Sequence, residues 1–189
     1  MPIIHTNRKA DKYYLHQSTT KKGNPRYYFS RSAAGNLVET IPQGYEVYEN
    51  PNTQVFLRKK MPQLISEAEI AIIEDNLKRN ESVKDCKIDV RETTLTIHVP
   101  DQEVSDVKAF GLDPQMNAVL KKFLAETGTY SPMMRFKLID ETERIFAVER
   151  YVFRGEGWWL PLGSGKDLQN LSKKYCQHLG KESFFELIF

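Results

Sequence analysis

Turn-forming residues divide the first 60 residues into short segments, and this division constrains the fold more than any other feature of the sequence. The segments 12–17, 26–31, 45–49 and 54–58 are rich in aromatic and apolar residues, and Gly, Asn and Pro lie between them. Short runs of this composition, bounded by turn residues, are typical of antiparallel strands. The sequence therefore predicts an N-terminal antiparallel sheet of about four strands.

Three helices are predicted in the rest of the chain, over 65–80, 113–128 and 167–179. Ser66 and Glu69 have the spacing of a capping box, in which the hydroxyl and the carboxylate each accept one unpaired backbone amide at the helix start. Asp113 precedes a proline, and Asp167 precedes an amphipathic run, so both carboxylates are placed as N-caps.

The remaining strands are predicted at 86–91, 94–99, 134–140, 144–153, 158–162 and 184–189. Pairing Val90 with Leu95 and Ile88 with Ile97 puts the apolar residues of the first hairpin on one face, which favours this register. Hairpin-linked strands with helices between them indicate an α+β fold rather than a parallel doubly wound sheet. We predict a basic, tyrosine-rich β-sheet segment over 1–60 and an α+β core domain over 61–189.

Charge and hydropathy exclude some classes of protein. The first 60 residues hold ten Lys or Arg against four Asp or Glu, whereas residues 61–189 hold seventeen against twenty-one. The longest stretch without a charge has nine residues, 157–165, against the ~20 that a membrane-spanning helix needs. Two cysteines do not make a disulfide framework. We therefore expect no membrane partner and a cytoplasmic location.

The two tyrosine-rich segments 12–17 and 26–31 suggest a binding surface. Matching their apolar faces pairs Leu15 with Tyr27 and Tyr13 with Phe29. The opposite face then carries the candidate polyanion-binding residues Lys12, Tyr14, His16, Arg26 and Tyr28. Cations interleaved with tyrosine suit a nucleic-acid strand, because the charges meet phosphates and the rings stack on bases. The alternative is a tyrosine-rich sheet whose second face is solvated or packed.

No pattern in the sequence predicts a catalytic residue, a metal ligand or a cofactor. The segment Gly163–Asp167 lacks both the first glycine and the Ser or Thr of a phosphate-binding loop. The two cysteines and four histidines lack the spacing of a zinc site. Trp158 and Trp159 are adjacent, so on a strand one is expected in the core and the other at an interface. Both are candidate interface residues.

We expect a soluble binding protein rather than an enzyme, whose basic and aromatic N-terminal sheet contacts nucleic acid or another polyanion. Two alternatives stay open. The first is a protein-interaction or structural subunit, which binds another protein or a second copy of the chain and no nucleic acid. The second is an enzyme whose carboxylates meet only in the folded structure.

Overall fold

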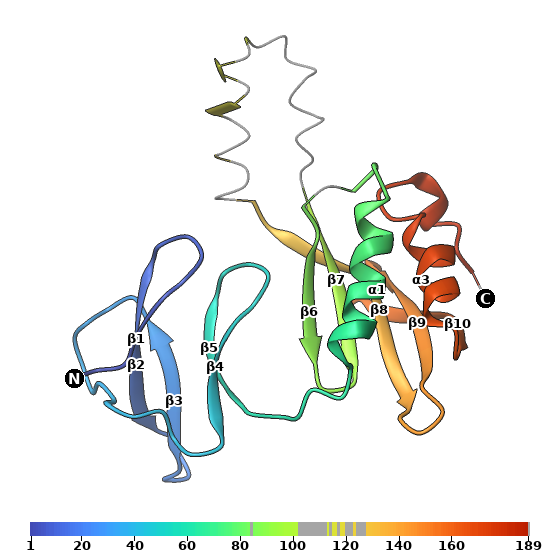
Figure 1. Cartoon of the computed structure of the whole chain (residues 1–189). Coiled ribbons are helices and arrows are strands. Elements are labelled where there is room, and N and C mark those ends of the chain that lie inside the picture. Colours follow the sequence, from blue (N-terminus) through green and yellow to red (C-terminus); the bar gives the residue numbers. More distant parts are fainter. Residues whose placement is uncertain are drawn as a thin grey trace. The chain divides into compact units, whose positions relative to one another are not determined.

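A computed structural model describes residues 1–83, 85–101, 113, 115–116, 118–119, 123 and 128–188. The chain divides into two compact units, unit 1 (Met1–Met61) and unit 2 (Pro62–Phe189). Antiparallel strands form both units, and the described helices lie in unit 2 (Figure 1). The fold is therefore α+β. None of the described helices has the length and apolar character that a membrane span needs.

Unit 1 contains two sheets where a single sheet of about four strands was predicted. Its strands are β1 (Ile4–Thr6), β2 (Lys12–Thr19), β3 (Pro25–Ser30), β4 (Tyr45–Glu49) and β5 (Val55–Lys59). The sheet β1-β2-β3 is separate from the hairpin β4-β5. One face of the larger sheet packs against the hairpin: Leu15 and Val55 are buried, and the rings of Tyr27 and Tyr45 lie 6.4 Å apart. Strand β1 escaped prediction because three residues are too few to show alternation.

The predicted register of β2 and β3 is wrong by two residues. Leu15 pairs with Phe29, and His16 pairs with Tyr28. The turn at residues 21–23 sets this register, because the Gly23 amide donates to the Thr20 carbonyl at 2.9 Å and Gly23 has a φ of 81°. Such a three-residue loop ends on a left-handed residue, which glycine adopts without strain. A two-residue slip leaves the faces unchanged, so the predicted division of side chains between the faces is confirmed.

Unit 2 is a five-stranded antiparallel sheet with two helices on one face (Figure 1). Its elements are α1 (Glu67–Lys78), β6 (Lys87–Arg91), β7 (Thr94–Pro100), β8 (Tyr130–Asp140), β9 (Ile145–Val152), β10 (Trp158–Gly165) and α3 (Leu168–Cys176). The strand order is β10-β9-β8-β7-β6. Apolar side chains of the helices and of one sheet face form the core, among them Ile73, Leu95, Ile97, Met134, Phe136, Val148 and Leu179. The predicted pairs Val90–Leu95 and Ile88–Ile97 are confirmed.

Two of the three predicted helices, α1 and α3, lie in the described part of the chain. The helix predicted over 113–128 lies for the most part outside the described residues. Ser66 and Asp167 are the N-caps of α1 and α3, as predicted. The strand predicted over 184–189 is wrong, because a short 3-10 helix (Glu182–Phe184) stands at its start. This helix turns the Phe184 ring into the core, where it is fully buried.

Candidate nucleic-acid interface

The five predicted polyanion-binding residues all lie on the face of the β1-β2-β3 sheet that is turned away from the β4-β5 hairpin. Tyr28 is directly opposite His16, and Arg26 is opposite Ser18. Lys12 lies at the far end of β2, opposite Thr6 of β1. At a strand rise of ~3.3 Å per residue, the rows of Lys12 and Arg26 are roughly 20 Å apart. The face is thus long and has a cation at each end.

A crossing segment divides this face at its middle. After β3, residues 31–36 pass over β2, and Leu37 then pairs with His16 on the other edge. The Ser32 carbonyl oxygen lies 2.9 Å from His16 Nε2, and a Cβ added at Gly35 would lie 3.5 Å from His16 Nδ1. His16 is consequently only 3% exposed. The five residues do not form one continuous surface, and His16 supports the face from within rather than contacting an external ligand.

Tyr28 is the ring of this face that is open to a ligand. It is 41% exposed, and it stacks on His16 with ring centroids 5.2 Å apart and an interplanar angle of 12°. His16 therefore covers one side of the Tyr28 ring, and the residue nevertheless keeps enough exposed surface to contact a ligand. Tyr14 is half-buried, between Ile4 and Ser30 in the adjacent strands. Of the two tyrosines on this face, Tyr28 is therefore the one whose ring is better placed to stack on a ligand.

The tip of the β2-β3 ribbon adds two cations that the sequence interpretation missed. Lys21 and Lys22 occupy the turn, and every residue from 19 to 26 is exposed. The sequence pattern predicts only a turn in this segment. The absence of any Asp or Glu between Lys12 and Val38 would have revealed it as a cationic ribbon. We call Lys21, Lys22, Arg26 and Tyr28 the ribbon surface.

Charges in unit 1 are segregated. Each of its four carboxylates pairs with a cation of the same unit: Asp11 with Arg31 at 2.8 Å, Glu39 with the N-terminal amine at 3.1 Å, Glu46 with Arg58 at 2.8 Å, and Glu49 with Arg8 at 2.7 Å. Among the described residues of unit 1, the cations of the ribbon surface have no ion-pair partner, and the same is true of Lys9, Lys12, Lys59 and Lys60. Their positive charge is therefore not neutralised within the unit and is available to an anionic ligand.

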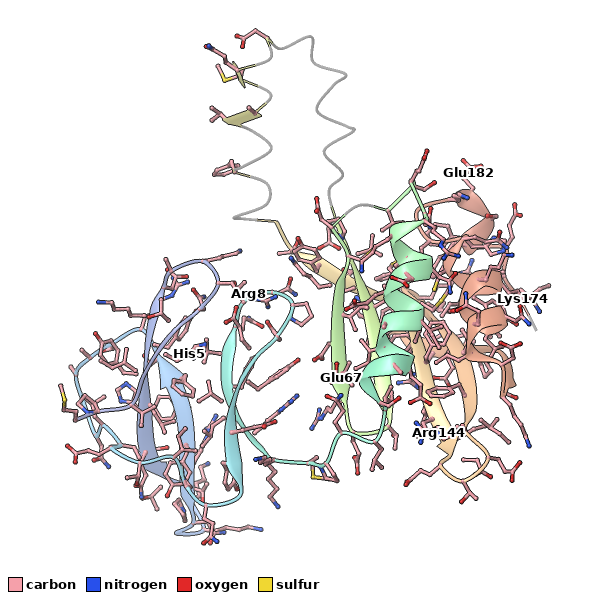
Figure 2. The ribbon with its side chains drawn as sticks, in the orientation of Figure 1. His5, Arg8, Glu67, Arg144, Lys174 and Glu182 are labelled. Carbon is pink, nitrogen blue, oxygen red and sulfur yellow. The ribbon has the colours of Figure 1, made fainter. Side chains whose placement is uncertain are left out.

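Glu49 is an example of a carboxylate of unit 1 that is paired with cations of the same unit and not with those of the ribbon surface. Arg8 lies in the loop between β1 and β2, and His5 lies on β1 (Figure 2). Both side chains hydrogen-bond Glu49 on β4. Burial raises the pKa of Glu49, but the hydrogen bonds from Arg8 and His5 outweigh burial and hold the pKa below its ordinary value. Glu49 thus stays charged at neutral pH and fastens the hairpin to the sheet.

The two tryptophans of unit 2 alternate as predicted, but neither is in the core. Trp158 is 50% exposed. Trp159 is half-buried under the Arg135 guanidinium, which lies 4.3 Å from the ring centroid, and its ring centroid is 5.1 Å from that of Tyr151. Trp159 faces the side of the sheet opposite the buried Val148, because its partner Tyr151 alternates with that residue along β9. The expectation of a core tryptophan is therefore wrong.

Two further features bear on chemistry, the two cysteines and a hollow beside the helices of unit 2. Burial raises the pKa of Cys86 to about 11 and that of Cys176 to about 12, so both are neutral thiols rather than nucleophiles at neutral pH. A hollow of about 430 Å³ at the C-terminal ends of α1 and α3 holds one carboxylate, Glu81. Within the described ranges, no three His, Cys, Asp or Glu side chains are grouped so that they could hold a metal ion.

Comparisons with family models, with curated proteins and with solved structures give no match.

Proposed function

We propose that this chain is a binding protein whose unit 1 contacts nucleic acid, or another polyanion, through the ribbon surface. The observation that carries the proposal is the segregation of charge: all four carboxylates of unit 1 are paired internally, while Lys21, Lys22 and Arg26 are exposed and unpaired among the described residues. Exposed lysines and arginines bind nucleic acid by neutralising phosphates and releasing their condensed counterions.

Hydrogen bonds between Thr20 and Asn24 close the turn at the tip of the ribbon. The Thr20 hydroxyl accepts the Asn24 amide at 3.1 Å, and the Thr20 amide donates to the Asn24 carbonyl at 2.8 Å. The turn therefore holds Lys21 and Lys22 beside each other at the tip. Backbone order in the free protein lowers the entropy that is lost on binding.

The test is a fluorescence-anisotropy titration of labelled oligonucleotides between about 50 and 200 mM salt. The intact chain is expected to bind more weakly as salt rises. Arg26→Ala or Lys22→Ala should weaken binding to all sequences alike and reduce the salt slope by roughly one for each lost phosphate contact. Lys60→Ala, which removes the same charge from the end of unit 1, is the matched control and should change binding less.

Two results would count against the proposal. An intact chain that binds no oligonucleotide even at low salt would exclude nucleic acid. Equal losses in Lys60→Ala and Lys22→Ala would show that net charge, and not the ribbon surface, governs binding. Titration with a polyanion that lacks bases, such as heparin, separates general polyanion binding from binding of nucleic acid.

A second candidate function is protein interaction through unit 2, which exposed apolar side chains favour. Trp158, Phe185 and Ile188 are 50%, 60% and 77% exposed. Arg150 holds the C-terminal segment near β10, because its Nε donates to the Leu187 carbonyl at 2.7 Å and Arg150 itself pairs with Leu160. If this surface joins two copies, Trp158→Ser should lower the mass measured by sedimentation equilibrium to that of a monomer. A parent chain that is monomeric at all concentrations excludes a second copy as the partner.

A further inference from the structure

Tyr28 is a preformed stacking platform. Its ring rests on His16 with an interplanar angle of 12°, and His16 is itself fixed beneath the crossing segment by its contact with the Ser32 carbonyl. Both side chains project from paired strands, so the ring is already oriented in the free protein. An aromatic ring with one supported side and one exposed side offers a π-face to a ligand at little entropic cost.

The three cations of the ribbon surface lie on one side of the platform, and Lys12 lies at the other end of the face. Arg26 lies two residues from Tyr28 on the same face of β3, roughly 7 Å along the strand, and Lys21 and Lys22 follow at the tip. In the other direction the crossing segment 31–36 covers the face. A ligand that places an aromatic group on Tyr28 therefore directs its anionic groups toward Arg26 and the tip.

We infer that the ligand of the ribbon surface is single-stranded nucleic acid, with one unpaired base stacked on the exposed side of Tyr28 and its phosphates toward Arg26 and the tip lysines. This inference rests on the proposed function and narrows it. Inside an undistorted duplex both faces of each base are occupied by its neighbours, whereas an unpaired base has a free face that can stack on a protein ring. A duplex would use the cations and leave the platform empty.

The experiment compares three probes that carry the same number of phosphates: a labelled oligothymidylate, a blunt-ended duplex without a loop, and an abasic deoxyribose-phosphate oligomer. The intact chain is titrated with each at one low salt concentration. It should bind the oligothymidylate more tightly than either other probe. Tyr28→Ala should weaken oligothymidylate binding about 5- to 150-fold, which is the contribution of one stacked base to the affinity. The same substitution should leave binding of the abasic oligomer unchanged.

Tyr28→Phe is the matched variant, because it keeps the ring and removes only the hydroxyl. It should retain the preference for the oligothymidylate over the abasic oligomer, and the circular-dichroism spectra of both variants should match that of the parent. Equal affinity of the parent for all three probes, or tighter binding of the duplex, would overturn the inference while the proposed function stands. If none of the probes binds at low salt, the proposed function and the inference both fail.

Discussion

At the residue scale, the start of α1 shows both what a local pattern can predict and what it cannot. The Ser66 hydroxyl accepts the Glu69 amide at 3.4 Å, and Glu69 Oε2 accepts the Ser66 amide at 2.8 Å, as the spacing predicts. Glu69 also accepts a hydrogen bond from Arg144 Nε at 2.9 Å. Arg144 lies at the turn between β8 and β9 (Figure 2). This second bond joins distant segments, so only the fold reveals it.

Replacing Ser66 by alanine should lower the free energy of unfolding by about 1 kcal/mol, because the first turn of α1 loses the side-chain acceptor for one of its unpaired amides. Urea unfolding at neutral pH measures the change. Ser164→Ala, at an exposed strand position, is the control and should stay within about 0.5 kcal/mol of the parent. Oligonucleotide binding should be unchanged by either substitution. A Ser66→Ala midpoint equal to that of the parent would contradict the assigned cap.

At the element scale, the sequence predicts which side chains share one face of a strand. It predicts less well which residues of adjacent strands pair with each other. The β6-β7 register was predictable because a one-residue slip would expose the buried Leu95 and Ile97. In the β2-β3 ribbon, two registers differing by two residues keep the same faces, and the turn geometry decides between them. The segment 31–36 that buries His16 has no periodic pattern. The basic and aromatic face was therefore predictable, but its division by that segment was not.

Gly180 lies shortly after α3, and substituting it tests how tightly the chain packs there. It has a φ of +75°, and an added Cβ would lie 2.5 Å from the Ser82 carbonyl oxygen. Gly155 has a φ of +62° with no atom within 4 Å of its added Cβ, so it carries the same backbone cost without the clash. Gly180→Ala should therefore destabilise the protein more than Gly155→Ala, by about 1–3 kcal/mol in urea unfolding. Equal losses would mean that the segment around Ser82 moves aside freely.

At the scale of the whole molecule, the ion pairs of carboxylates have two structural effects. In unit 1 they hold the hairpin to the sheet through Glu49 and leave the cations of the ribbon surface uncompensated. In unit 2 they hold α1 to the turn after β8 through Glu69 and Arg144. The hydrogen bonds from Arg144 and Ser66 outweigh the effect of burial, which raises the pKa of Glu69, so the pKa lies below its ordinary value of about 4.5. The pKa of Glu49 is lowered in the same way.

These two lowered pKa values predict how stability depends on pH. A carboxyl whose pKa is lower in the folded than in the unfolded state stabilises the fold above the unfolded pKa, and that contribution is lost as the pH falls through the folded pKa. The free energy of unfolding should therefore fall as the pH drops below about 4.5. Glu69→Gln should be less stable than the parent at pH 7, and the difference should shrink on acidification. Urea unfolding at about pH 7 and pH 3 measures both, with Glu186→Gln, at an exposed position, as the control. A Glu69→Gln deficit that is equally large at both pH values would show that Glu69 acts through its shape and hydrogen bonds rather than through its charge.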